Sequence, residues 1–563
     1  MTKNWAILLI IILASFLRIY QIGLVPHGFN ADEAAIGYND YSLITTGRDE
    51  HGNFWPLHFR SFNDYKPGGY FYLALPFVKL LGLSEPAVRL PSVIFGVWSV
   101  YLIFLLARQL IPVPGNLISR IQFSYPEIAA LMLAISPWHI QFSRGAWETN
   151  VATAFLILGT WLFVKGVSRN RFSDYVCSLV AFVVSAYVYH SSRILAPLLL
   201  LLLIWLNRKI FFLQKSKLAI WLVIGFLLSF PLLLSFLKGG ALARFSGVGI
   251  TGDIGPFWNT NRLRGEHGPD MDAFWVKILH NRPLSYLIKI LANWSSHFGG
   301  DFLFISGDPI VRSNCPGIGQ FYYLDLLFFV LGAFFILRER KTSFGFLTAW
   351  LMIAPLPASL TLQSPHALRS HSMVVPFLLI VAYGIYRFLL SLKSSIPDRI
   401  CNPGPGAAKG KILILLLVVI SVYFWQLGYF LKSYLADYPI NSPQVWEYGM
   451  KELVSYLEPI HNQYRKILVT DKYDQPYILF LFYLKYPPAV FQKEAVLTPR
   501  DKFGFSTVRD FDNFHFEEID WEKLKDQENV LIVGTDEEIP DSANIVKRIY
   551  FRNNRPAFEI AEL

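Results

Sequence analysis

Two adjacent carboxylates follow the first apolar segment of the chain. They are Asp32 and Glu33 in "FNADEAAIGY" (29–38), a few residues after an apolar stretch that ends at Val25. A carboxylate in such a place can act as a general base and remove the proton of an attacking hydroxyl. The same pair could instead lie on a solvated surface or cap a following helix. The pair alone therefore does not define a site, and the choice between these interpretations depends on the other groups around it.

Other ionisable groups recur next to later apolar segments. The arginines among them could be snorkelling anchors, and the histidine could be interfacial. Ionisable groups near a bilayer are costly unless they are paired or functional, so their concentration favours a site. The candidate residues are Tyr65 and Lys66 in "DYKPGGY", Arg144 and Glu148 in "QFSRGAWE", Arg193 in "YHSSR", and His366 and Arg369 in "PHALRS".

Carboxylates beside several cations suit the transfer of a sugar from a lipid phosphate to a hydroxyl. A phosphate diester is a good leaving group, so this reaction needs no general acid, unlike ordinary glycoside hydrolysis with its two carboxyls. One aspartate can take the proton of the acceptor. Lysine or arginine side chains can bind the departing phosphate as its charge builds. Backside attack would invert the anomeric carbon.

The composition indicates that membrane helices carry these groups. Of the 563 residues 53% are hydrophobic and 16% are charged, whereas soluble domains carry about 25% charged residues. Apolar runs near the length of about 20 residues that crosses a bilayer recur along the chain. The net charge is +10, but the basic residues fall in short links between apolar runs, as in the cytoplasmic loops of membrane proteins. We therefore expect a polytopic α-helical membrane protein and no nucleic-acid partner.

The chain is predicted to cross the membrane about eleven times. The basic links alternate along the chain, which places the loops 26–89 and 238–320 and the tail 432–563 on the extracytoplasmic side. All the candidate site residues then share that side. The predicted spans are 5–25, 88–110, 125–142, 149–166, 175–190, 193–207, 218–237, 320–337, 343–362, 372–391 and 411–431.

The tail differs in character from residues 1–431. "KILVT" (466–470) and "NVLIVG" (529–534) are short β-branched runs, and helix-like segments at 442–458 and 475–486 flank the first of them. Strands that alternate with helices are typical of a small α/β domain. We predict a transmembrane catalytic domain at 1–431 and an extracytoplasmic α/β domain at 432–563.

The first outward loop resembles the start of the GT-C glycosyltransferases. The likeness is strongest to the branch with the protein O-mannosyltransferases and the aminoarabinose transferases of lipid A. That branch has an acidic pair after the first helix, a G-x-D-x-x-G turn, a "KPP-x-x-Y" element and "G-x-S-E-x-x-x-R-x-P". Here these are Asp32 and Glu33, Gly47 to Gly52, "KPGGY" and Gly82 to Pro91, with Gly68 in place of the second proline.

The resemblance implies roles for the candidate residues. Asp32 would be the general base, Glu33 a supporting catalytic residue, and Lys66, next to Tyr65, a contact of the lipid phosphate. Arg144 and Glu148 would line the cavity. Arg193, His366 and Arg369 are further candidates for the phosphate cluster.

The sequence therefore predicts an inverting, membrane-embedded glycosyltransferase of the cell envelope. Its donor would be a polyprenyl-phosphate monosaccharide at the outer face of the plasma membrane, and its acceptor a protein, a lipid or a glycan. No cofactor is indicated, and a divalent metal stays open because no ligand spacing argues for one. The alternative is a transporter or flippase of lipid-linked sugars, for which polar groups near the bilayer midplane and repeat symmetry would be expected.

Overall fold

The computed structural model describes most of the chain. Its contacts divide the chain into two compact units: unit 1 is Met1–Arg18, Phe95–Ser143 and Thr149–Phe430, and unit 2 is Ile19–Ile94, Arg144–Glu148 and Leu431–Leu563. The predicted domain boundary at 431 stays a prediction. The residues described are 5–111, 124–212, 215–237, 248–339, 343–394, 406–501 and 505–563, so residues 238–247 of the second predicted loop lie outside them.

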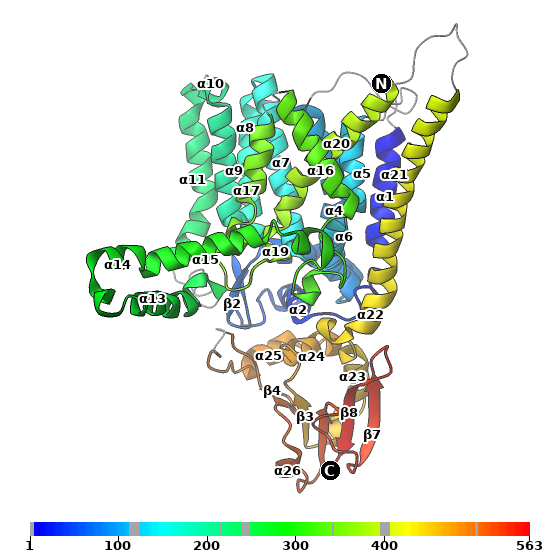
Figure 1. Ribbon diagram of the computed structural model, residues 1–563. Coiled ribbons are helices and arrows are strands. Elements are labelled where there is room, and N and C mark those ends of the chain that lie inside the picture. Colours follow the sequence, from blue (N-terminus) through cyan, green and yellow to red (C-terminus); the bar gives the residue numbers. More distant parts are fainter. Residues whose placement is uncertain are drawn as a thin grey trace. The chain divides into compact units, whose positions relative to one another are not determined.

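Long apolar helices dominate the part of the chain before the tail (Figure 1). Helices suit a bilayer because every backbone polar group within them is paired. In the described residues, five segments are long and apolar enough to cross a membrane: Glu85–Leu110, Glu148–Arg169, Ser216–Ser235, Ala367–Leu392 and Ile414–Asn441. The principal helices are α1 (Trp5–Ile19), α4 (Glu85–Leu110), α5 (Tyr125–Ile135), α6 (Pro137–Arg144), α7 (Glu148–Arg169), α8 (Phe172–Val188), α9 (Ser192–Leu206), α11 (Lys215–Leu237), α16 (Tyr323–Arg338), α17 (Ser343–Ile353), α20 (Val374–Ser394) and α21 (Gly406–Lys432).

Each predicted span overlaps at least one of these helices, but two spans are interrupted. The span at 125–142 is split between α5 and α6 at Ser136, whose backbone is extended. The span at 343–362 is split into α17, which ends at Ile353, and the short helix α18 (Leu356–Ser359). The residues 175–207 form two helices, α8 and α9, that pack against each other.

Two glycines allow α16 and α20 to approach closely. A Cβ at Gly332 would lie 2.0 Å from the carbonyl oxygen of Ile380, and one at Gly384 would lie 2.0 Å from that of Phe328. Small residues at such crossings let helix backbones pack tightly within a membrane. Any side chain at either glycine would push the two helices apart.

Unit 2 contains elements that the sequence analysis did not predict within the loop 26–89. They are α2 (Ala31–Thr46), the hairpin of β1 (His58–Ser61) and β2 (Asp64–Pro67), and α3 (Gly69–Leu81), which packs against α2. Asn30 caps α2 by accepting a hydrogen bond from the Glu33 amide at 3.1 Å. Gly47, in the left-handed conformation with φ of 71°, ends it, as glycine does at many helix C-termini.

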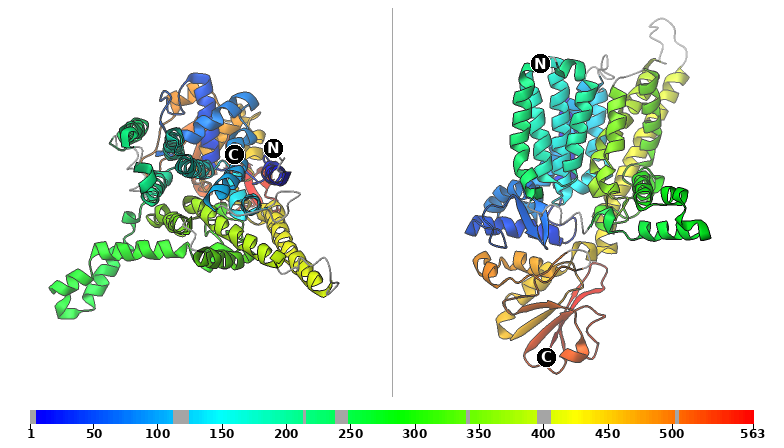
Figure 2. Two further views of the ribbon diagram at one scale, coloured as in Figure 1. Left: turned by 90° about the horizontal axis from the view of Figure 1, so that it is seen from above. Right: turned by 90° about the vertical axis from the view of Figure 1, so that its left-hand side faces the viewer.

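The tail contributes a six-stranded mixed sheet to unit 2 (Figure 2, right). Its order is β4-β5-β3-β6-β8-β7, and β3 is parallel to both of its neighbours. The predicted strands are β3 and β6, and the predicted helices correspond to α23 (Met450–Leu457) and α24 (Pro476–Leu484). The strands are β3 (Lys466–Thr470), β4 (Asp510–Phe511), β5 (Phe514–Glu517), β6 (Val530–Gly534), β7 (Ile545–Tyr550) and β8 (Pro556–Glu562).

Tail helices pack on α2 within unit 2. Tyr38 donates a hydrogen bond to the carbonyl of Tyr486 at 3.1 Å, and the rings of Phe29 and Phe482 lie 4.6 Å apart.

The fold class that the sequence predicts, a mostly helical membrane protein with a small C-terminal α/β sheet, is confirmed.

Candidate active site

Asp32 and Lys66 form an ion pair in unit 2. Asp32 is in the first turn of α2, and Lys66 reaches it from β2, where its Nζ donates a hydrogen bond to Asp32 Oδ1. The side chain of Asp32 is 45% exposed, whereas that of Lys66 is 7% exposed. The hairpin therefore holds a buried ammonium group against a carboxylate that solvent or a substrate can reach.

Glu33, the second acid of the pair, has a different environment. It is buried, and Arg89 of α4 binds it through two parallel hydrogen bonds of 2.9 and 2.8 Å. The amide of Ala146 donates a third hydrogen bond of 2.8 Å to Oε1 of Glu33. Arg89 also donates to the carbonyl oxygen of Gly28 at 2.8 Å. Since its carboxylate is already used in this way, Glu33 is suited to positioning the start of α2 and not to accepting a proton from a substrate.

Arg144 and Glu148 lie on either side of Ala146, in the segment that reaches Glu33. Arg144 is buried and donates hydrogen bonds from one nitrogen to the carbonyl oxygens of Tyr20 and Val25, at 2.7 and 3.0 Å. Its guanidinium also lies over the ring of Tyr434, 5.5 Å from the centroid. These contacts fix the segment after α1. Glu148 is half-buried at the first turn of α7.

Tyr65 is half-buried on β2, next to Lys66, and pairs across the hairpin with Arg60. Because successive side chains on a strand point to opposite faces, Tyr65 and Lys66 are on different faces of the hairpin. Of the two, Lys66 is the one that contacts Asp32.

A buried acid that the sequence analysis missed lies close to this pair. Glu50 is fully buried and exchanges two hydrogen bonds with Asn39 of α2, at 3.1 and 3.0 Å. Burial raises the pKa of Glu50 to about 8, while Asn39 and the nearby charge of Lys66 act in the opposite direction. Asn39 is two turns from Asp32 on the same face of α2. The sequence offered one hint of this buried acid, because Glu50 directly follows Asp49 in the turn from Gly47 to Gly52.

Asp49, the acid of the G-x-D-x-x-G turn, is a structural residue. Its carboxylate accepts hydrogen bonds from the amides of His51 and Asn53 at 3.0 and 2.8 Å, and from the side chain of Asn53. Such bonds from a side chain to the following backbone are typical of aspartate in tight turns. They hold the turn that carries Glu50.

The remaining candidates belong to unit 1. Arg193 donates to the carbonyl of Ala186 at 3.4 Å. His366 is buried, its Nδ1 lies 3.4 Å from Asp308 Oδ2, and its amide donates to His297 at 3.1 Å. Arg369 donates to the Thr361 hydroxyl at 2.7 Å. The contacts of His366 and Arg369 order the loop before α20, whereas that of Arg193 joins the start of α9 to the end of α8.

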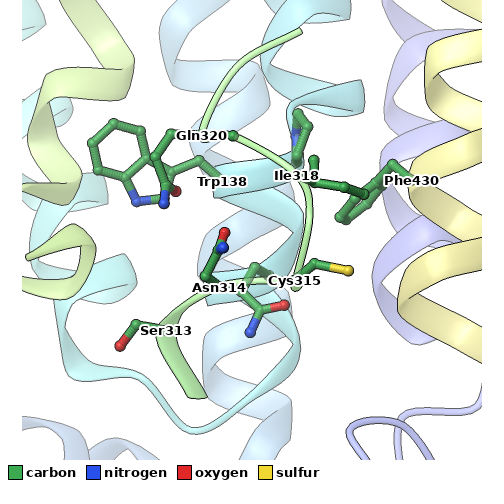
Figure 3. A pocket seen from close by; sticks show the side chains of 10 residues that line it. Trp138, Ser313, Asn314, Cys315, Ile318, Gln320 and Phe430 are labelled. Atoms are coloured by element: carbon green, nitrogen blue, oxygen red, sulfur yellow. The ribbon is translucent and has the colours of Figure 1, made fainter. Parts of the chain in front are cut away.

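The described residues also include a small pocket of unit 1 but no cluster of possible metal ligands. Across the described ranges, no three His, Cys, Asp or Glu side chains gather so that they could hold a metal ion. A small pocket of unit 1, of about 190 Å³, is lined by Trp138, Ser313, Asn314, Gln320 and Phe430 among others, and includes none of the predicted site residues (Figure 3).

Residues 65–234 match the model of the dolichyl-phosphate-mannose-protein mannosyltransferase family. This match includes Lys66, Arg144 and Arg193 but begins after Asp32. No curated protein matches the chain in sequence.

Solved structures share the fold along almost the whole chain. ArnT from Cupriavidus metallidurans bound to undecaprenyl phosphate is 13% identical, with a TM-score of 0.54, over 100% of this chain and 98% of that one. The apo form of the same protein gives 14% and 0.52, over 98% and 97%. The Archaeoglobus fulgidus oligosaccharyltransferase, tethered to an acceptor peptide, is 11% identical with a TM-score of 0.50, over 86% of this chain and 63% of that one.

Together, the family match and these structures confirm the prediction of a GT-C fold. The chain thus shares the fold of these structures, and its residues 65–234 are similar to the dolichyl-phosphate-mannose-protein mannosyltransferase family.

Proposed function

We propose that this chain is an inverting glycosyltransferase that moves one monosaccharide from a polyprenyl phosphate to a hydroxyl of an acceptor. The observation that carries the proposal is the contact between the accessible carboxylate of Asp32 and the buried ammonium of Lys66. The same fold in ArnT, bound there to undecaprenyl phosphate, supports a lipid phosphate as the donor. The archaeal oligosaccharyltransferase tethered to an acceptor peptide supports an acceptor outside the lipid.

In the proposed reaction the ion pair opens when the donor binds. The phosphate competes with Asp32 for Lys66, because a phosphate oxygen is an equally good partner for an ammonium group. Asp32 then accepts the proton of the acceptor hydroxyl as that hydroxyl attacks the anomeric carbon. The bond from that carbon to the phosphate oxygen breaks, its electron pair stays on the phosphate, and Lys66 stabilises the added charge. The products are the glycosylated acceptor with an inverted anomeric centre and a polyprenyl phosphate.

The other candidates have supporting roles in this proposal. Glu33 holds the start of α2 through Arg89, and Arg144 holds the segment after α1. Glu148 is proposed to line the cavity, and Arg193, His366 and Arg369 stay further candidates for contacts with the phosphate. We place the site at the outer face of the plasma membrane, as the distribution of basic loops predicts.

The test uses the full-length protein in lipid nanodiscs with synthetic polyprenyl-phosphate monosaccharides and a panel of hydroxyl acceptors. The proposal predicts stoichiometric release of polyprenyl phosphate and a product with an inverted anomeric centre. If the protein in sealed vesicles only moves the intact lipid-linked sugar across the bilayer, it is a transporter and the proposal is wrong. Labelling of a cysteine at position 32 from the cytosolic side would contradict the proposed orientation.

A further inference from the structure

Three short helices of unit 1 form an arm between the spans. They are α13 (Gly255–Gly265), α14 (Phe274–Leu279) and α15 (Arg282–Ser296), of which α13 and α15 pack against each other. Figure 1 shows them reaching sideways from the other helices of the unit, and the view from above in Figure 2 shows the same extension. Within the described residues of unit 1, α15 packs against α18, and Figure 1 shows α13 and α14 apart from the long helices.

The outward face of α15 is apolar. Leu287, Ile288 and Leu291 share one side of the helix, and Ile288 is 57% exposed. Its buried positions are instead polar: Ser285 hydrogen-bonds to Thr260 of α13 at 2.7 Å. A helix on the surface of a soluble protein has the opposite arrangement, with its apolar stripe toward the core.

The other two helices continue this apolar surface. Phe274 of α14 is 79% exposed, and Trp275, Ile278 and Leu279 beside it are about half exposed. Trp258 of α13 is also exposed. Contiguous exposed apolar residues on this scale mark an interaction surface. Tryptophan in particular is enriched at the boundary between lipid and water.

Both ends of the arm are fixed at one end of a predicted span. At its start, Ile250 donates to the carbonyl of Leu360 at 2.9 Å. At its finish, Asn293 donates to the carbonyl of Thr361 at 3.2 Å, and Trp294 donates to that of Met352 at 2.9 Å. All three acceptors belong to the predicted span 343–362, two of them at its end. Both ends of the arm are therefore joined to the predicted span 343–362, with two of the three bonds at its last residues.

Length and charge indicate how the arm meets the bilayer. The 15 residues of α15 give a helix of about 22 Å, too short to cross a hydrocarbon core of about 30 Å. Residues 250–296 contain five Lys or Arg and four Asp or Glu. Because these charges nearly balance, apolar insertion and not attraction to anionic lipids has to provide the binding.

We propose that α13 to α15 form an interfacial arm that lies along the membrane, with Leu287, Ile288, Leu291 and the aromatic side chains of α13 and α14 inserted into the lipid. Amphipathic helices of this kind are buried by about 5–10 Å into the boundary between headgroups and acyl chains. The arm enlarges the area over which unit 1 contacts the bilayer. Its C-terminal end, at Asn293 and Trp294, contacts the predicted span that precedes the loop with His366.

The experiment places an environment-sensitive fluorophore on a single cysteine at Ile288 or, as the matched control, at Glu266 of the same arm. The full-length protein, otherwise free of cysteine, is reconstituted in nanodiscs with acyl chains brominated near the headgroup or near the tail end. We expect blue-shifted emission at position 288, quenching mainly by bromine near the headgroup, and little change when anionic lipid is omitted. Position 266 should show weaker quenching.

Water-like emission at position 288 without quenching would overturn the proposal. Shielding at position 288 that depends on protein concentration, without quenching by the lipids, would show that a second copy covers the face and would overturn it equally. The unmodified protein provides a check that needs no substitution. A photoactivatable carbene probe dissolved in the bilayer should label the peptide 282–296, and absence of that label would contradict the proposal.

Discussion

The start of α2 places two neighbouring acids in opposite environments. Asp32 is half exposed and accepts a hydrogen bond from Lys66, whereas Glu33 is buried and accepts three hydrogen bonds from Arg89 and Ala146. Two consecutive residues of α2 therefore differ: a substrate can reach the carboxylate of Asp32, whereas that of Glu33 already accepts hydrogen bonds within the fold. In the proposed mechanism one carboxylate of the pair is catalytic and the other is positioning, so each can be disturbed without the other.

The largest expected effect is on stability, at Glu33. Glu33→Gln leaves the guanidinium of Arg89 buried without its charge partner, and breaking a buried pair in this way costs about 3–5 kcal/mol. We expect a large fall in melting temperature, measured in detergent by intrinsic tryptophan fluorescence. The double variant Glu33→Gln/Arg89→Met should be more stable than Glu33→Gln alone, because it removes the uncompensated charge. Equal melting temperatures for Glu33→Gln and wild type would remove the distinction between the two acids.

A smaller effect is expected on donor binding, at Lys66. Lys66→Met removes a charged hydrogen-bond donor, and such bonds contribute about 1.5–3 kcal/mol, which is about 10- to 150-fold in Kd at about 1.4 kcal/mol per tenfold. The measurement is titration of the purified protein with polyprenyl phosphate. Lys79→Met, at an exposed position on α3, is the control and should bind as the wild type does. Unchanged affinity of Lys66→Met for polyprenyl phosphate would show that Lys66 does not contact the phosphate.

A further expected effect is a pH dependence of stability from Glu50. Burial holds its pKa at about 8 in the folded state, well above the ordinary value of about 4.3. The folded state thus binds more protons than the unfolded state between these values, so ionisation of Glu50 lowers stability as pH rises from about 4.3 to 8. Glu50→Gln should flatten the decline of melting temperature over this window, most clearly in the difference between pH 5 and pH 8. The same slope in variant and wild type would show that Glu50 is not the group that titrates.

The sequence predicted one of these two environments well. The motif around Asp32 and the "DYKP" element indicated the carboxylate and the cation, and α2 and β2 bring them together. It assigned no role to Arg89, although "SEPAVRLP" was part of the resemblance, because a contact across 56 positions leaves no trace in local periodicity. Glu50 was missed for the same reason, since its burial depends on how distant segments pack.

The fold shows a similar division. Apolar runs predicted the spans, and β-branched runs predicted β3 and β6. β7 was missed because most of its residues are exposed, so that "IVKRIY" lacks the apolar character of a buried strand. The arm was missed because its polar side faces the chain, which inverts the pattern by which amphipathic helices are recognised.

The most direct test of the central claim compares Asp32→Asn with wild type in single turnover, with polyprenyl-phosphate sugar already bound. We predict donor affinity at least as high as in the wild type, because the variant removes the carboxylate that competes with the phosphate for Lys66, and a transfer rate lower by about 10²–10⁴-fold, the usual contribution of a general base. Transfer by Asp32→Asn at the wild-type rate would show that the exposed carboxylate does not remove the proton, and the account of this site would be wrong.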